Sequence, residues 1–296
     1  MKRALFALAI LWISVAAAAQ EHAEHQTTTA APAPAMQAGQ PWAKQALEAS
    51  PRHREWVNIK SGDRTVSAFV VYPETKKKAT SVVVIHEIFG MSDWVQMLTD
   101  ELAAAGYIAI APDLLSGMGP NGGGTSAFAD GQAVGKAIRD LPPDQITADL
   151  NAVADYVSKL PAANGKVAAG GFCWGGTQTF RFATNRPSLA AAFVFYGSSP
   201  EAPEAIAAIK APVYGFYAGN DARIGATVPK TQEMMSAAKK KYEIVTYEGA
   251  GHGFMRAGDA PAPAADADAK VREAYVANKK ARDEAWARWK ELLKKL

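Results

Sequence analysis

The chain has 296 residues, of which 49% are hydrophobic and 21% charged, a composition typical of a globular protein with a sizeable core. Its formal net charge is +3, and Lys and Arg are spread along the chain, which argues against nucleic acid as a partner. The single cysteine excludes an intramolecular disulfide.

The N-terminus has the layout of a secretory signal peptide. Lys2 and Arg3 precede an apolar run that ends in small residues at 16–19. We therefore expect residues 1–19 to be removed and the protein to be exported to a periplasm, or secreted. The apolar run is too short to span a bilayer, so no membrane association is expected after signal removal.

Residues 20–45 are rich in Ala, Thr, Gln and Pro, which predicts a flexible leader. His22 and His25 have a spacing compatible with a metal ion, but two histidines in such a segment are weak evidence for a site. No nucleotide or flavin motif occurs either, so we expect no cofactor and no metal. Residues 46–296 are predicted to form a single domain.

Strand-like and helix-like segments alternate along this domain. Seven mostly apolar runs are typical of strands: Thr65–Tyr72, Ser81–Ile85, Tyr107–Ala111, Lys166–Gly170, Ala191–Tyr196, Val213–Tyr217 and Tyr242–Tyr247. Four segments between them have helical length and spacing: Trp94–Ala105, Ile146–Leu160, Thr177–Thr184 and Val228–Lys240. The alternation predicts an α/β fold with a mostly parallel central sheet and helices on both faces.

Two further segments have a recognisable character. The glycine-rich stretch between Ser116 and Thr147 is long enough to form a loop or a short helix over a site. Near the C-terminus, Trp286, Trp289 and Leu293 recur at near-helical spacing on a charged segment. This pattern predicts an amphipathic helix that docks on the sheet, with its tryptophans as core anchors.

The lone cysteine lies in the most informative motif. Gly171, Cys173 and Gly175 form the pattern G-x-C-x-G between a predicted strand and a predicted helix, which is a nucleophile elbow with sulfur in place of the usual serine oxygen. At a helix N-terminus, backbone N–H groups and the helix dipole favour a thiolate, and the Trp174 N–H could donate to an oxyanion. Taken alone, a free cysteine is more often a small buried hydrophobic residue.

A thiol nucleophile needs a base and an acid that orients the base. Only one histidine, His252, follows Cys173, and it comes directly after the last predicted strand. Asp221 follows the penultimate strand, and the resulting order of nucleophile, acid and histidine is that of α/β-hydrolases. His53 and His86 precede the elbow, and either could be a structural histidine.

Together these segments resemble the dienelactone hydrolase family of α/β-hydrolases over residues 56–296. The resemblance is carried by four blocks: His86-Glu-Ile-Phe-Gly, Gly171-Phe-Cys-Trp-Gly-Gly, Gly219-Asn-Asp and Gly251-His-Gly-Phe-Met-Arg, with Tyr196-Gly-Ser in addition. It implies an α/β-hydrolase fold and a hydrolase that cleaves a lactone or carboxylic ester through a Cys-His-Asp triad and an acyl-enzyme.

The resemblance also implies roles for residues outside the triad. Glu87 would contact the resting thiol and help to deprotonate it when an anionic substrate arrives. The Ile88 N–H would be the second oxyanion donor, and Arg256 would meet a substrate carboxylate, with Phe89 beside the substrate. The family's second carboxylate-binding arginine has no clear counterpart, because the residues around Arg139 match no motif.

Each of these roles has an alternative. Glu87 could be a surface acid closing a strand, Arg256 a loop cation, and Trp174 or Phe89 simple packing against the sheet. At the level of the whole protein, the alternative is a non-catalytic binding or thiol redox-sensing protein on the same scaffold. A serine esterase is not supported, since no G-x-S-x-G occurs. We expect a monomer acting on a small-molecule ester or lactone.

Overall fold

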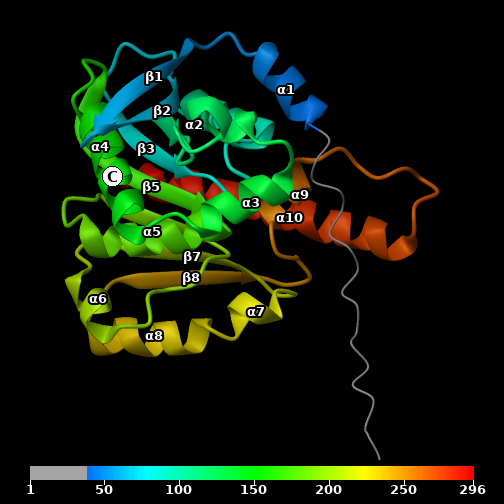
Figure 1. Cartoon of the computed structure of the whole chain (residues 1–296). Helices are drawn as coiled ribbons and strands as arrows, with labels where there is room; N and C mark the ends of the chain where they lie inside the picture. Colours follow the sequence, from blue (N-terminus) through cyan, green and yellow to red (C-terminus); the bar gives the residue numbers. More distant parts are fainter. Residues whose placement is uncertain (1–38) are drawn as a thin grey trace, which may run out of the picture. The chain divides into compact units, whose positions relative to one another are not determined.

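The computed structural model describes residues 39–296, which contain one eight-stranded sheet in the order β1-β2-β4-β3-β5-β6-β7-β8 (Figure 1). Its strands are β1 Arg54–Ser61, β2 Arg64–Val71, β3 Ala79–Ile85, β4 Ile108–Pro112, β5 Ala163–Phe172, β6 Ala191–Phe195, β7 Val213–Ala218 and β8 Tyr242–Tyr247. The β1–β2 and β2–β4 pairs are antiparallel, and all others are parallel. The predicted α/β architecture is therefore confirmed.

Helices cover both faces of the sheet. They are α1 Pro41–Glu48, α2 Asp93–Ala104, α3 Gly131–Arg139, α4 Pro143–Ser158, α5 Trp174–Asn185, α6 Pro203–Ala208, α7 Ala222–Gly225, α8 Val228–Ala237, α9 Phe254–Asp259 and α10 Ala269–Leu293. Residues of α2 and α10 share one buried layer with Val82 and Val84 of β3. Residues of α4, α5 and α8 share the other with Val83 and Ile85, so successive residues of β3 serve opposite layers.

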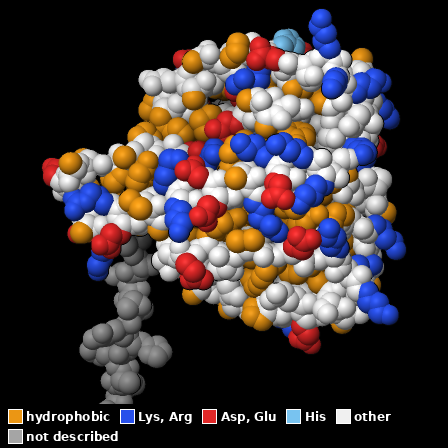
Figure 2. Space-filling view, turned by 180° about the vertical axis from the view of Figure 1, so that it is seen from behind, with side chains coloured by type: hydrophobic (Ala, Val, Ile, Leu, Met, Phe, Trp, Pro, Cys, Tyr) orange, Lys and Arg blue, Asp and Glu red, His pale blue; other side chains and the backbone are white. Residues whose placement is uncertain are grey.

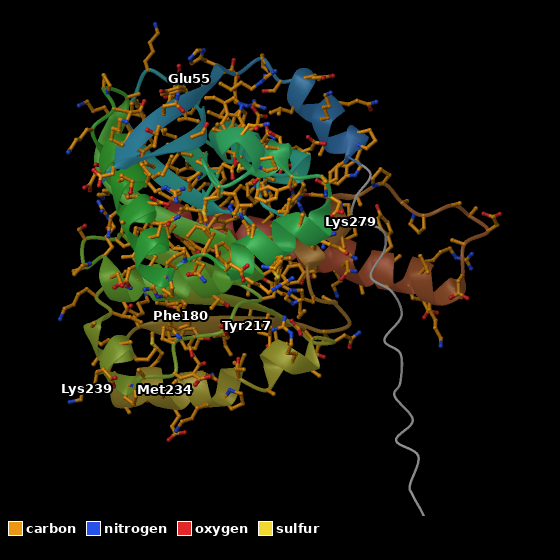
Figure 3. All side chains as sticks on the ribbon, viewed as in Figure 1. Glu55, Phe180, Tyr217, Met234, Lys239 and Lys279 are labelled. Atoms are coloured by element: carbon orange, nitrogen blue, oxygen red, sulfur yellow. The ribbon has the colours of Figure 1, made fainter. Side chains whose placement is uncertain are left out.

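Phe180 of α5 and Met234 of α8, both labelled in Figure 3, belong to the apolar layer that contains Val83 and Ile85. In the space-filling view, positive and negative side chains are interspersed across the visible face (Figure 2). No helix within residues 39–296 is long and apolar enough to cross a membrane.

All seven predicted strands are present, but β1 was missed. It carries five charged or polar side chains and buries only Ile59 and Ser61, because β1 lies at the sheet edge and pairs only with β2. The turn that joins them contains Gly62 with φ +58°, which suits a tight hairpin.

The predicted boundary of the leader at residue 45 also needs correction. Helix α1 begins at Pro41, inside the predicted leader, and Ala43 is fully buried while Trp42 and Leu47 pack against the α2 layer. The Gln40 side chain accepts a hydrogen bond from the Trp94 N–H at 2.8 Å, which fixes the start of α1 to α2. The predicted signal peptide, His22 and His25 lie outside the described residues.

The segment predicted to cover a site is partly regular. It contains two short 3₁₀ turns, η1 Pro120–Gly122 and η2 Thr125–Ala127, followed by α3.

At the C-terminus, the amphipathic helix is α10, in which Trp289 is fully buried and Trp286 half-buried. The N-terminal part of α10 extends beyond the rest of the domain (Figure 1).

Candidate active site

The predicted nucleophile lies at a strained turn. β5 ends at Phe172, α5 begins at Trp174, and Cys173 between them has φ 56° and ψ −117°, a conformation that costs free energy for a residue other than glycine. The Cys173 N–H donates to the Phe195 carbonyl at 3.1 Å, which ties the turn to the neighbouring strand β6. The sulfur is half-buried.

The glycines of the motif are required by close backbone approach. A Cβ on Gly171 would lie 2.2 Å from the Gly175 carbonyl oxygen. A Cβ on Gly175 would lie 2.3 Å from the carbonyl oxygens of both Ile85 and His86. The pattern G-x-C-x-G therefore reflects the packing of α5 onto the ends of β3 and β5.

Asp221 and His252 form a hydrogen-bonded pair across the ends of β7 and β8. The His252 Nδ1–H donates to Asp221 Oδ2 at 2.5 Å, and the other carboxylate oxygen accepts the Ile224 N–H at 3.3 Å. Asp221 is buried, whereas 30% of the His252 side chain is exposed. This arrangement fixes the imidazole tautomer and leaves Nε2 available for proton transfer.

Two backbone amides act on the cysteine sulfur. Those of Trp174 and Ile88 both lower the pKa of the Cys173 thiol. These are the two amides that the sequence predicted for an oxyanion hole. Amides that act on the nucleophile are well placed to donate to the oxygen of an acyl group bonded to it.

Comparison with known proteins agrees with this geometry. A sequence model of the dienelactone hydrolase family matches residues 66–296. The chain belongs to the dienelactone hydrolase family. A second family model, described as a protein of unknown function, matches residues 2–114.

Individual relatives support the same assignment. A Salmonella typhi protein assigned as a carboxymethylenebutenolidase is 35% identical over 210 residues, which cover 67% of this chain and 76% of the relative. A Saccharolobus solfataricus protein with the same assignment is 30% identical and covers 78% of this chain and 94% of its own length. A crystal structure from Klebsiella pneumoniae assigned as a dienelactone hydrolase has a TM-score of 0.69 at 25% identity, covering 83% of this chain and 100% of the other. The protein is a lactone or ester hydrolase of this family.

Within this dienelactone hydrolase fold, Glu87 and Arg256 form a buried ion pair. The Arg256 Nε–H donates to Glu87 Oε2 at 2.8 Å, and only 3% of the Glu87 side chain and 18% of the Arg256 side chain are exposed. The guanidinium carbon also lies 5.6 Å from the centre of the Phe89 ring. Glu87 is thus not a surface acid, and the arginine expected to meet a substrate carboxylate is paired with it.

The resting thiol is neutral at physiological pH. Burial raises the pKa of Cys173 to about 11, and the negative charge of Glu87 adds to this effect. The amides of Trp174 and Ile88 and the charge of Arg223 act in the opposite direction but do not outweigh burial. The helix N-terminus acts in the expected direction, towards a thiolate, but burial outweighs it in the resting state.

His86 has a structural position that the sequence left open. Its Nδ1–H donates to the Glu87 carbonyl at 2.8 Å, and its Nε2 accepts the Leu114 N–H at 3.4 Å. Its ring stacks on that of Trp174, with centroids 5.6 Å apart. Burial lowers the pKa of His86, so the ring is neutral and holds the segments that carry both oxyanion donors.

Two residues near the site had no predicted role. Tyr196 has φ 39°, and its ring lies 5.0 Å from that of His252. Its hydroxyl is buried without a hydrogen-bond partner in the described chain, and burial raises its pKa well above 10. Arg223 is exposed, forms no ion pair within residues 39–296, and is close enough to lower the Cys173 pKa. Only the Tyr-Gly-Ser block signalled Tyr196, and no pattern signalled Arg223.

Side chains of α10 hold the loop that carries His252 and the helix α9 that follows it. The Asn278 side chain in α10 accepts the Gly251 N–H at 2.8 Å, and Arg282 pairs with Asp259 at the end of α9.

Arg139, considered as a second carboxylate-binding arginine, is exposed on α3. No group of His, Cys, Asp and Glu suited to a metal ion occurs within the part of the chain that the structure describes.

Proposed function

We propose that this hydrolase uses Cys173 as a nucleophile, His252 as its base and acid, and Asp221 as the residue that orients His252. The observation that carries the proposal is the position of Cys173 at the strained elbow, where the amides of Ile88 and Trp174 lower the pKa of its thiol. The hydrogen-bonded Asp221–His252 pair supports it, because an oriented imidazole is what a thiol nucleophile needs.

The reaction has two halves. In the first, the thiol proton passes to His252 Nε2, directly or through Glu87, the sulfur attacks the acyl carbon, and the carbonyl oxygen becomes an oxyanion between the two amides. The C–O bond then breaks, and His252 gives a proton to the leaving alkoxide, which leaves a thioester on Cys173. In the second half, His252 takes a proton from water, whose oxygen attacks the thioester and releases a carboxylic acid and the free thiol. With a lactone, alcohol and acid are released as one hydroxy acid.

The Glu87–Arg256 pair would link substrate binding to activation of the thiol. A carboxylate on the substrate competes with Glu87 for Arg256, because both are anions that can accept its N–H bonds. Glu87 released from Arg256 gains basicity beside a thiol that needs to lose a proton. In the absence of substrate, the protonated thiol resists oxidation, which suits an exported protein.

The test is hydrolysis of dienelactones, simple lactones and p-nitrophenyl esters by protein lacking residues 1–19, beside Cys173→Ala and Cys173→Ser. Rapid quenching and mass spectrometry should show the mass of the acyl group on the peptide containing Cys173. Because Cys173 is the only cysteine, alkylation of the wild type must abolish turnover. Turnover that survives both the alanine variant and alkylation would overturn the proposal.

Export to the periplasm also belongs to this proposal. It rests on the signal-like residues 1–19. Cell fractionation and sequencing of the mature N-terminus test it, with a new N-terminus near residue 20 as the expected result. A cytoplasmic protein that retains residues 1–19 would contradict it. Sedimentation of the purified protein tests the expected monomer.

A further inference from the structure

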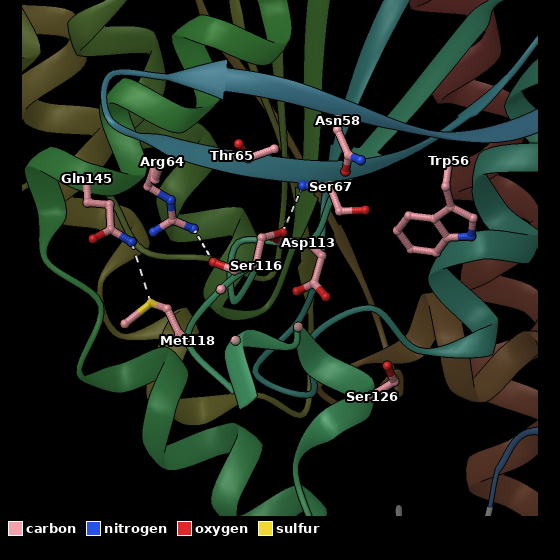
Figure 4. Close-up of a pocket in the computed structure, with 13 residues that line it drawn as sticks. Trp56, Asn58, Arg64, Thr65, Ser67, Asp113, Ser116, Met118, Ser126 and Gln145 are labelled. Carbon is pink, nitrogen blue, oxygen red and sulfur yellow. Dashed lines mark hydrogen bonds between the residues drawn. The ribbon is translucent and has the colours of Figure 1, made fainter. Parts of the chain in front are cut away.

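A cavity lies between the β1–β2 hairpin and the glycine-rich segment 116–126 (Figure 4). Its volume is about 750 Å³, and it is open to solvent. None of the residues proposed for catalysis lines it. The cavity therefore needs an explanation separate from the hydrolytic site.

An exposed tryptophan forms one end of this cavity. Trp56 is 49% exposed, and it is the one aromatic side chain among the large exposed hydrophobic residues of the described chain. Its ring packs at 5.4 Å against Phe69, its cross-strand neighbour, which fixes the indole on the hairpin. A fixed indole offers a flat apolar face together with one N–H donor.

Neutral polar side chains with free hydrogen-bonding capacity lie beside the indole. Asn58 and Ser67 are directly opposite each other in the register of β1 and β2, on the same face as Trp56, and Ser126 lies on the other wall. The Asn58 amide and the hydroxyls of Ser67 and Ser126 make no hydrogen bond to another residue within 39–296. Together they provide several donors and acceptors without charge.

The charged side chains of the cavity already have hydrogen-bond or ion-pair partners within the protein. Asp113 accepts hydrogen bonds from the Thr125 N–H and hydroxyl, both at 2.7 Å, and from the Leu115 N–H at 3.1 Å. Arg64 donates to the Ser116 carbonyl at 2.8 Å and pairs with buried Asp149 at 3.5 Å. A ligand in this cavity therefore meets no free ionic partner, which disfavours an anion or a cation.

The walls are held together without a ligand. The Ser116 hydroxyl donates to the Asp113 carbonyl at 2.5 Å and accepts the Ser67 N–H at 2.9 Å, so the glycine-rich segment is fastened to β2. Gly124 packs so closely on Asp113 that a Cβ there would lie 2.3 Å from a carboxylate oxygen. A cavity built in this way is pre-formed, which lowers the entropic cost of binding.

We propose that this cavity binds a neutral carbohydrate. A sugar ring has an apolar C–H face that can lie on the Trp56 indole, and hydroxyls that can both donate to and accept from Asn58, Ser67 and Ser126. Purely apolar ligands would leave these polar groups without partners, and charged ligands would find none. The site would hold a saccharide without taking part in bond cleavage.

Binding is tested with the signal-free protein and neutral oligosaccharides, namely cellohexaose, maltohexaose, xylohexaose and chitin hexamer. Calorimetry and saturation-transfer NMR measure affinity in the wild type, in Trp56→Ala and in Asn58→Ala. Val276→Ala, which alters an exposed apolar residue on α10, is the matched control. Circular dichroism and thermal unfolding check that each variant is folded.

We expect at least one oligosaccharide to bind, with affinity at least about tenfold weaker in Trp56→Ala, or about 1.4 kcal/mol. Trp56→Phe should recover part of the loss, and Val276→Ala should bind like the wild type. Failure of all four sugars to bind would overturn the proposal, as would affinity that persists in Trp56→Ala. Because binding is measured without turnover, this result is independent of the proposed Cys173 mechanism.

Discussion

Replacement of Glu87 by Gln should make the resting thiol more acidic. Glu87 is the second largest cause of the raised Cys173 pKa of about 11, after burial. At pH 7 that pKa leaves about one thiol in 10⁴ ionised, and each unit of decrease gives about tenfold more thiolate. Removal of a nearby negative charge is expected to lower the pKa by about one unit, while burial keeps it above its ordinary value of 9.0.

The assay is the rate of alkylation by iodoacetamide from pH 6 to 11, since only the thiolate reacts and no other cysteine competes. Glu87→Gln should react about tenfold faster than the wild type at neutral pH, with its midpoint shifted to lower pH. Glu248→Gln changes an exposed carboxylate outside the Cys173 environment and serves as the matched control. A Glu87→Gln profile that overlays that of the wild type would refute the electrostatic argument.

Three other changes have expected outcomes. Asp221→Asn removes the acceptor that fixes the His252 tautomer, so kcat should fall by about 10³–10⁴-fold with little change in KM; a loss below tenfold would contradict its orienting role. Arg223→Gln should lower kcat/KM more for anionic than for neutral esters, whereas Lys230→Gln should leave both unchanged; equal losses on both substrates would argue against an electrostatic role. Cys173→Ala should flatten the loss of stability between about pH 9 and 11. There the unfolded wild-type thiol ionises while the folded thiol stays neutral, which costs up to about 2 kcal/mol in denaturant titrations; identical pH dependence of the two proteins would argue against the raised pKa.

The parts of the site that follow one another in sequence were predictable. Gly171, Cys173 and Gly175 announce a tight strand–turn–helix junction because only glycine tolerates the backbone contacts found there. The end of a buried strand is also visible as the end of an apolar run, and this placed Asp221 and His252 after β7 and β8. The residues that form the elbow can therefore be recognised from a short stretch of sequence.

What was missed depends on contacts between distant residues. Glu87 and Arg256 are 169 positions apart, so no local pattern shows that they pair in the resting state. The raised pKa of Cys173 follows from burial by the assembled fold, which outweighs the local effect of the helix N-terminus. β1 escaped prediction for the opposite reason: as an edge strand with exposed polar residues, it lacks the apolar run that marked the others.

Helix α10 is the last element of the domain to be synthesised, and this affects when the site can become active. This helix follows every other element of the domain, yet Trp289 packs beneath the elbow strand at Gly170, where a Cβ would lie 2.5 Å from the indole, and Asn278 holds the loop before His252. A growing polypeptide therefore contains every proposed catalytic side chain before it contains the helix that holds them in register. Hydrolytic competence should appear only after Ala269–Leu293 has been synthesised and docked, so the thiol has no oriented base during elongation of the chain.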